Sequence, residues 1–410
     1  MSTFAQSCVV RVAMAAVAMA ASVTVVHGQE RQPGVVDCSR PLPSPITQTA
    51  AQGGRPKATR DGCWLFGLRA GPDFGIVVIR RNGDTFEQVR SVVTPVNPVN
   101  PGYQDLALTH DEKVLVMSSG DQLTFFDTGK LMSGEGDPLL GRIGGKQFRV
   151  GFGVVITPDD KYVLAVQSGT SVVVMVDLAK ARVSGFNEGA VVTSLPASFP
   201  IMLAVSPDGR FLYATNQRTP DVISAPRTCS AGKEPEDVVS VYDLTKAATN
   251  GGASATIGFA FPAGCNPQTI HLSPDGARLY VTAGGEFTDP TIPAAENVLA
   301  VFDTRPVLEG KPPTPLARVP VPTLPIAVVD TGKRVVVGFL GIPARNPNPS
   351  NLLVIDAARI ASGGTAILGT LPIRGGTLGL MPDGHTVIVN TGKGVAFVDV
   401  DRAPIQPVQK

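Results

Sequence analysis

The sequence predicts an all-β protein, and three observations support that prediction. Glycine and proline are abundant, at 44 and 36 of 410 residues, and both interrupt helices while favouring turns. Together they stay below the share that is typical of disordered chains. One phrase of apolar strand, Pro-Asp-Gly type turn and second apolar strand returns along the chain. Many short strands joined by turns are therefore expected, rather than a mainly helical fold.

The first 28 residues have the three-part layout of a secretory signal. A weakly basic stretch ends at Arg11, and an uncharged apolar run extends from Val12 to Val26. This run of about 15 residues is shorter than the roughly 20 that a membrane-spanning helix needs. We predict a signal peptide over residues 1–28 and export to the periplasm or the cell exterior. Gln29 is then the mature N-terminus, and cleavage after Ala20 is the alternative.

The next segment, residues 29–60, is predicted to be an irregular lead-in. Prolines recur in it and Gly53-Gly54 follows them, a composition that favours turns over strands. No later segment is long and apolar enough to cross a membrane.

The recurring turn carries aspartate, and three of its seven copies have proline directly before it and glycine directly after it. Aspartate stabilises tight turns through its own backbone contacts, and glycine adopts the positive φ angle that they need. A weak first copy reads Asp61-Gly62. The plainer copies are Thr109-His-Asp-Glu112, Thr157-Pro-Asp-Asp160, Ser206-Pro-Asp-Gly209, Ser273-Pro-Asp-Gly276, the degenerate Asp330-Thr-Gly332, and Met381-Pro-Asp-Gly384. We interpret these aspartates as structural, because copies spread over separate repeats cannot converge on one ion.

A third strand follows in each repeat and ends in an aspartate in six copies: Asp127, Asp177, Asp243, Asp303, Asp356 and Asp399. A fourth, outer strand then completes the repeat. Successive turns lie 48 to 67 residues apart, which leaves room for four strands of ordinary length. A period near fifty with strong turn signals is typical of a β-propeller. We therefore predict a seven-bladed β-propeller of four-stranded antiparallel blades over residues 61–410.

The outer strand of the last blade has two candidates. The third strand of that blade ends at Asp399, and only Ile405–Gln409 remains beyond it. Either this tail or an N-terminal segment near Gly34–Cys38 closes the ring.

Two repeats carry a resemblance to a known family. They read Ser206-Pro-Asp-Gly-Arg-Phe-Leu-Tyr-Ala-Thr-Asn216 and Ser273-Pro-Asp-Gly-Ala-Arg-Leu-Tyr-Val-Thr282, each followed by a strand ending in Tyr242-Asp243 or Phe302-Asp303. The pattern resembles the YVTN family of seven-bladed propellers, whose relatives include lactonase-like propellers. The resemblance extends from about Asp61 to Asp401. It implies the fold and permits a lactonase activity, but fold analogy alone names no reaction.

The cysteines predict two disulfides. Cys8 lies in the signal, so the mature chain holds Cys38, Cys63, Cys229 and Cys265, with no zinc or redox spacing. Cys229 lies in the insertion of blade four, and Cys265 lies in the connection from blade four to blade five. Both fall on one face of the propeller, so we predict the pairs Cys229–Cys265 and Cys38–Cys63.

Blades four, five and six are lengthened between their second and third strands. The insertions cover about residues 217–237, 285–296 and 341–350 and emerge on one face. Loops on rigid scaffolds often bind ligands, so we predict a ligand- or protein-binding face here. Its candidate residues are Asp221, Glu234, Glu286, Asp289, Glu296 and Asn346. Their spacing matches no calcium motif, and no metal or cofactor is predicted, although a calcium ion between blades four and five stays open.

The first strand of each blade should line the central channel, and alignment on the turns gives two inward columns. One is Ala107, Val155, Ala204, His271, Ala327 and Gly379, and the other is Asp105, Gly153, Met202, Thr269, Pro325 and Thr377. A histidine near a carboxylate can act as general base on an ester or lactone, so His271, Asp105 and Thr269 are the catalytic candidates. A lone polar residue that holds ordered water is the simpler interpretation.

Composition and missing motifs narrow the function. The net charge is +1, and the insertions do not interleave basic with aromatic residues, so no nucleic-acid partner is expected. The sequence has no Gly-x-Ser-x-Gly elbow and no His-Glu-x-x-His zinc motif. We expect an exported monomer that binds a small molecule or an envelope or extracellular protein. The alternative is a lactonase-like hydrolase with His271 as general base, and whether the protein is an enzyme stays open.

Overall fold

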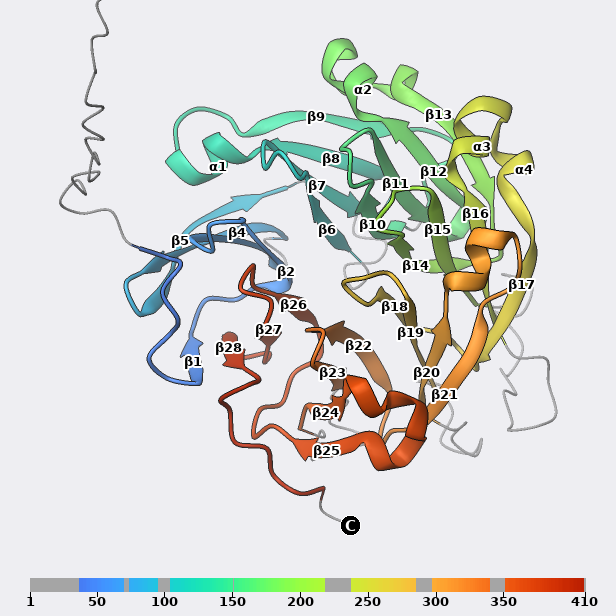
Figure 1. The fold of residues 1–410 in the computed structure, drawn as a ribbon. Helices are drawn as coiled ribbons and strands as arrows, with labels where there is room; N and C mark the ends of the chain where they lie inside the picture. The colour runs from blue at the N-terminus through green and yellow to red at the C-terminus, as the bar shows by residue number, and fades with distance from the viewer. Residues whose placement is uncertain are drawn as a thin grey trace, which may run out of the picture. The chain divides into compact units, whose positions relative to one another are not determined.

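The computed structural model describes residues 37–69, 74–94, 104–149, 151–217, 237–284, 297–339 and 351–408. These residues form seven four-stranded antiparallel sheets, arranged as the blades of a propeller (Figure 1). Inner strands of neighbouring blades contact one another all the way around, and the last inner strand returns to the first. The prediction of a seven-bladed all-β propeller is therefore confirmed.

Each blade runs from an inner strand outwards in chain order, apart from the last. Blade 1 is β2 (Gly54–Ala58), β3 (Trp64–Arg69), β4 (Gly75–Asn82) and β5 (Thr85–Val93). Blade 2 is β6 (Asp105–Leu108), β7 (Val114–Ser119), β8 (Gln122–Asp127) and β9 (Leu139–Gly144). Blade 3 is β10 (Gly151–Ile156), β11 (Tyr162–Gln167), β12 (Val172–Asp177) and β13 (Val191–Pro196). Blade 4 is β14 (Pro200–Val205), β15 (Phe211–Asn216), β16 (Asp237–Asp243) and β17 (Thr256–Gly264).

The remaining blades follow the same order. Blade 5 is β18 (Thr269–Leu272), β19 (Arg278–Ala283), β20 (Val298–Asp303) and β21 (Thr314–Pro320). Blade 6 is β22 (Pro325–Asp330), β23 (Arg334–Phe339), β24 (Leu353–Asp356) and β25 (Ile367–Thr370). Blade 7 is β26 (Leu378–Leu380), β27 (Thr386–Asn390) and β28 (Val395–Asp399), with β1 (Ile46–Thr49) as its outer strand.

The ring is closed by the N-terminal strand. β1 pairs antiparallel with β28, and Ile46 lies opposite Val398. The C-terminal tail, the other candidate, does not close the ring. It pairs with blade 6 instead, through a bridge between Gln406 and Thr370. The N-terminal alternative is correct, but its position near Gly34–Cys38 is not, because the closing strand begins eight residues after Cys38.

The propeller also starts before Asp61, the boundary that the repeat predicted. Both β1 and β2 lie within residues 29–60, which were expected to be irregular. Neither strand has an apolar run that would reveal it in the sequence, because β1 reads Ile-Thr-Gln-Thr and β2 reads Gly-Arg-Pro-Lys-Ala. Proline fits at Pro56 because the register of β2 against β3 shifts between Gly54 and Lys57.

The turn aspartates bond to their own turns. In the turn of blade 5, Ser273 donates its hydroxyl to Asp275 at 2.6 Å, and the Ala277 N–H donates to the same oxygen at 3.0 Å. These bonds hold the pKa of Asp275 below its usual range. The same backbone bond is accepted by Asp61, Asp111, Asp159, Asp208 and Asp383. The structural interpretation of these residues is confirmed.

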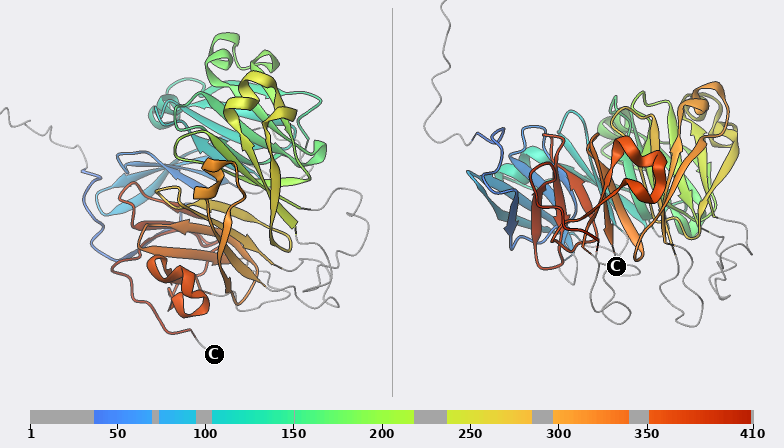
Figure 2. Two further views of the ribbon diagram at one scale, coloured as in Figure 1. Left: turned by 45° about the vertical axis from the view of Figure 1, so that its right-hand side comes forward. Right: turned by 60° about the horizontal axis from the view of Figure 1, so that its bottom comes forward.

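In blades 2 to 6 a helical segment follows closely after the strand-end aspartate, and Figure 2 shows these segments on one side of the ring. Helical segments follow the third strands: α1 (Thr128–Ser133), α2 (Leu178–Ser184), α3 (Leu244–Asn250), α4 (Gly252–Ala255), η4 (Arg305–Glu309) and η5 (Ala357–Ala366). Two short 3-10 segments, η1 (Ser168–Thr170) and η2 (Glu188–Ala190), complete the list of described helices. Asp127 and Asp177 each accept the N–H of the residue three positions on, at 3.0 and 2.9 Å. Each carboxylate therefore satisfies a backbone donor that a helix start leaves free.

The core lies between the faces of adjacent blades. Strand residues that face a neighbouring blade are apolar and fully buried, including Tyr242, Phe339 and Phe397. One cluster joins blades 3, 4 and 5 through Leu164, Phe211 and Phe302. This packing fixes the inner strands and hence the channel that they line.

Candidate functional site

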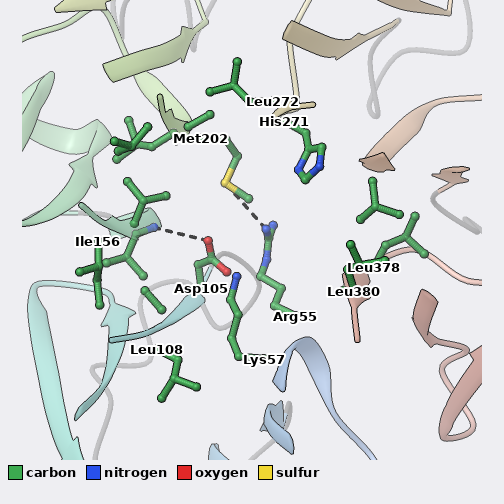
Figure 3. A pocket seen from close by; sticks show the side chains of 18 of the residues that line it. Arg55, Lys57, Asp105, Leu108, Ile156, Met202, His271, Leu272, Leu378 and Leu380 are labelled. Carbon is green, nitrogen blue, oxygen red and sulfur yellow. Dashed lines mark hydrogen bonds between the residues drawn. The ribbon is translucent and has the colours of Figure 1, made fainter. Parts of the chain in front are cut away.

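The seven blades surround a central channel. It has a volume of about 690 Å³, and inner strands of all seven blades contribute to its wall. Figure 3 shows side chains from opposite sides of the ring pointing into this space. The prediction that first strands line a channel is therefore correct.

Most residues of the two predicted inward columns line the channel. They are Ala107, Val155, Ala204, His271, Ala327, Gly379, Asp105, Met202, Thr269 and Thr377. Gly153 and Pro325 are not among the lining residues. Small side chains dominate one column, which is why the channel stays open.

Two cations that were not predicted from the sequence, Arg55 and Lys57, line the channel from β2. Lys57 occupies the same place in blade 1 as Ala107 in blade 2, and Arg55 matches Asp105. The signal was present, because counting back from Gly62 as from Glu112 reaches both residues. The prediction of an irregular lead-in over residues 29–60 excluded β2 from the repeat, and with it these two residues.

Arg55 adopts an unusual backbone conformation. Its φ angle is +47°, in the left-handed region that glycine tolerates best, and it lies in the irregular stretch of β2. Its N–H donates to the hydroxyl of Thr377 at 3.2 Å, which fastens blade 1 to blade 7. Holding a non-glycine residue in such a region costs on the order of 1 to 3 kcal/mol, and such strain is concentrated at functional sites.

Among the described residues, neither channel cation has an anionic partner. The one side-chain hydrogen bond of the Arg55 guanidinium to a described residue goes to the thioether sulfur of Met202 at 3.7 Å, a weak acceptor (Figure 3). Lys57 is half-buried, and within the described ranges its ammonium makes no hydrogen bond or ion pair. The channel therefore presents two positive groups to whatever occupies it.

Asp105 is buried and bonds to the backbone. Its carboxylate accepts the N–H of Leu106 at 2.9 Å and that of Val154, in the next blade, at 3.4 Å. Thr269 is also structural, since its hydroxyl donates to the carbonyl of Ile326 at 2.9 Å. Each of these predicted catalytic residues thus joins two blades.

His271 lines the channel but stands apart from the other two candidates. No hydrogen bond joins it to Asp105 or Thr269 in the described part of the chain. Burial lowers the pKa of His271 to about 4, and the positive charge of Lys57 acts in the same direction. The imidazole is therefore neutral at pH 7 and is a weaker base than an unperturbed histidine.

We expect His271 to titrate near pH 4 in an NMR titration of the histidine ring signals, with His271→Gln used to assign its resonance. The unfolded chain, with an ordinary pKa near 6.5, binds more protons between pH 4 and 6.5. The free energy of unfolding should therefore rise with pH across this window, on the order of 2 to 3 kcal/mol for this group. His271→Gln should lose that contribution, and a measured pKa of 6.5 or above would contradict the prediction.

Two acidic residues fasten adjacent blades beside the channel, on the turn face. Glu112 and Asp160 stand where other turns have glycine, with φ angles of +57° and +56°. The carboxylate of Asp160 accepts the backbone N–H groups of His110 and Asp111 in the preceding blade, both at 2.7 Å. Glu112 accepts the N–H of Arg60 in the same way. These carboxylates lock blades 1, 2 and 3 together.

The predicted loop site lies outside the described residues. This applies to Asp221, Glu234, Glu286, Asp289, Glu296 and Asn346, and to Cys229. Within the described ranges, no group of three or more His, Cys, Asp or Glu residues is placed to hold a metal ion.

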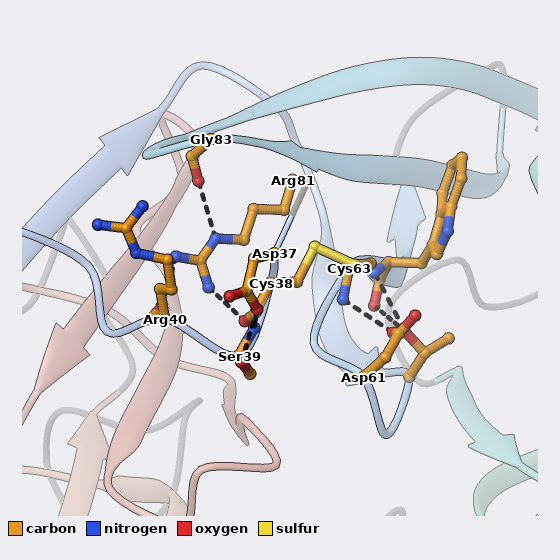
Figure 4. The surroundings of a disulfide bond; sticks show 10 residues. Asp37, Cys38, Ser39, Arg40, Asp61, Cys63, Arg81 and Gly83 are labelled. Carbon is orange, nitrogen blue, oxygen red and sulfur yellow. Dashed lines mark hydrogen bonds between the residues drawn. A yellow bond between two sulfur atoms is a disulfide. The ribbon is translucent and has the colours of Figure 1, made fainter. Parts of the chain in front are cut away.

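One predicted disulfide is present, and it fastens the segment before β1. Cys38 and Cys63 are bonded, with their Cα atoms 5.2 Å apart (Figure 4). Cys265 is also disulfide-bonded. In the described ranges, no helix is long and apolar enough to span a membrane.

The fold and the channel define the class: a seven-bladed β-propeller with a ligand-sized central channel. Hydrazine synthase from Kuenenia stuttgartiensis matches it with a TM-score of 0.62 and 16% identity, over 86% of this chain and 97% of that one. The Cps50 (Swd1) propeller domain from Myceliophteria thermophila matches with a TM-score of 0.58 and 12% identity, over 87% and 98%.

A proposed 6-phosphogluconolactonase from Bacteroides fragilis also matches, with a TM-score of 0.51 and 18% identity, over 73% of this chain and 79% of that one. The sequence matches no protein-family model and no curated protein. At these identities the likeness concerns the fold, which is the part of the resemblance to lactonase-like propellers that the structures support.

Proposed function

We propose that this protein is a ligand-binding module whose site is the central channel. The main support is that Arg55, Lys57 and His271 face one cavity and make no strong hydrogen bond or ion pair through their side chains with the described residues. The volume of about 690 Å³ lies within the range of small-molecule sites, roughly 300 to 1,000 Å³. Strands, rather than loops, hold these groups, which favours a site formed before the ligand arrives.

Export is part of this proposal. The Cys38–Cys63 disulfide is compatible with an oxidising compartment, and residues 1–28 have the pattern of a signal peptide. The insertions of blades 4 to 6 stay a prediction for a ligand- or protein-binding face. Deletion of residues 285–296 should then abolish the capture of a partner from a periplasmic extract and leave the fold intact.

The lactonase alternative is not favoured. Asp105 and Thr269 bond to backbone groups of neighbouring blades, so no carboxylate in the described part of the chain orients His271. Its lowered pKa also makes it a poor general base at neutral pH. Turnover of a lactone panel by the wild-type protein, lost in His271→Ala, would reverse this conclusion.

Filling the channel should abolish small-molecule binding. Ala107 lines the cavity, so Ala107→Trp places an indole inside it. The mature protein is equilibrated with a metabolite extract, and the retained compounds are identified by mass spectrometry. Wild-type protein should retain a defined set of compounds that Ala107→Trp does not.

Val183→Trp is the matched control, because Val183 is 91% exposed on α2 and does not line the channel. It should retain the same compounds as wild type. If Ala107→Trp unfolds, Ala327→Phe replaces it on the opposite part of the ring. Equal retention by a folded channel-filled variant would exclude the channel as the site.

A further inference from the structure

We infer that the ligand of the channel is an organic anion whose carboxylate or phosphate group lies between Arg55 and Lys57. This inference rests on the proposed function and specifies its ligand class. It depends on the charge of the channel, the conformation of Arg55 and the surroundings of His271.

The channel has more positive than negative charge at its centre. Arg55 and Lys57 both line the channel from β2, and Figure 3 shows both side chains pointing into it. The described lining residues include two carboxylates, Asp105 and Glu112, and both accept backbone N–H groups. Two like charges that share one half-enclosed channel are unfavourable unless an anion balances them. An anion in the channel supplies that balance.

The conformation of Arg55 supports the same conclusion. The residues at its place in the other blades are Asp105, Gly153, Met202, Thr269, Pro325 and Thr377, and none of them has a positive φ angle. Arg55 alone is held in the left-handed region, and there its side chain extends into the cavity (Figure 3). A fold that only needed a compact residue here would tolerate glycine at lower cost. The guanidinium instead offers a planar fork that matches a carboxylate or phosphate.

The rest of the cavity fits the body of such a molecule. Met202, Leu272 and Leu378 present apolar surface around the charged groups. His271 adds a neutral imidazole whose ring nitrogens bond to no described residue. One nitrogen can donate and the other accept a hydrogen bond, which suits a hydroxyl or amide group on the ligand.

The experiment compares charged and neutral probes on the full mature chain. Binding of succinate, inorganic phosphate and the uncharged analogue succinamide is measured by calorimetry, and the His271 ring signal is followed by NMR. We expect at least one of the two anions to bind and to raise the pKa of His271, because its charge offsets that of Lys57. Succinamide should bind at least tenfold more weakly than succinate. The stronger of succinate and phosphate identifies the anionic group.

Variants separate the channel from general electrostatics. Arg55→Met and Lys57→Met should each weaken anion binding about tenfold or more and remove the response of His271. Lys393→Met removes the same charge from an exposed turn outside the cavity and should bind like wild type. Because the Lys57 ammonium makes no described bond, Lys57→Met should fold normally.

The two proposals fail in different ways. Equal binding of succinamide and succinate, both blocked by Ala107→Trp, would overturn the anion inference and leave the channel as the site. Anion binding that Ala107→Trp does not change would overturn the channel itself. Absence of any anion binding at millimolar concentration, with no response of His271, would also overturn the anion inference.

Discussion

A chain that lacks residues 37–49 will fail to form a closed ring. This deletion removes β1 and exposes the edge of β28, whose five residues are all buried in the intact protein. It also removes Cys38 and with it the disulfide to Cys63. Lost ladder hydrogen bonds, at about 1 kcal/mol each, and the lost crosslink, at about 2 to 4 kcal/mol, together exceed roughly 5 kcal/mol. That is comparable to the whole stability of many domains.

The C-terminal tail provides the matched comparison. Truncation after Ile405 keeps that side chain packed against the core and removes the bridge between Gln406 and Thr370 with the few residues beyond it. It should cost about 1 to 2 kcal/mol, since two backbone hydrogen bonds are lost. Both variants are followed by thermal unfolding with circular dichroism and by size-exclusion chromatography. A cooperative transition for the N-terminal deletion, at the midpoint of the tail truncation, would show that β1 does not close the ring.

Arg81→Met will destabilise the protein by about 3 to 5 kcal/mol. The Arg81 side chain is only 5% exposed and donates to three carbonyl oxygens: those of Cys38 at 2.6 Å, Arg40 at 2.6 Å and Gly83 at 2.9 Å (Figure 4). Methionine fills similar space but leaves these acceptors unpaired, and hydrogen bonds to charged groups are the costlier ones to lose. The neighbouring residue on β4 is the control.

Arg80 makes an ion pair with Glu87 at 2.6 Å, but both side chains are more than 40% exposed. Solvent screens such pairs, so Arg80→Met should change the free energy of unfolding by no more than about 1 kcal/mol. Urea unfolding of the two variants measures the difference directly. Similar losses for both would show that the buried bonds of Arg81 contribute no more than a surface charge.

The fold could be predicted because each repeat contains a turn with a recognisable sequence. An aspartate that bonds to its own turn, followed directly by a residue with positive φ, is a local requirement that six of the seven blades meet, and in blade 6 the positive-φ residue is Gly332, two positions after Asp330. The same logic found ten of the lining residues of the channel. Ring closure could not be settled in this way, because pairing of β1 with β28 joins residues about 350 positions apart and depends on tertiary contacts.

The residues of the site were harder to predict than the fold that positions them. Thr269 and Asp105 looked like partners of His271 by position, but their bonding to adjacent blades is visible only in three dimensions. Arg55 and Lys57 were missed because β2 has neither the apolar alternation nor the β-branched residues of a typical strand. A strand held in register by its neighbours needs little propensity of its own.

The closing strand also sets the order in which the chain can mature. β1 leaves the ribosome, and under our proposal the export channel, long before its partner β28 exists. The Cys38–Cys63 bond spans only 25 residues, so it can form as soon as blade 1 is made and can keep the waiting strand beside that blade. The last event in folding is then a short search by a tethered strand, rather than a long search by a free terminus.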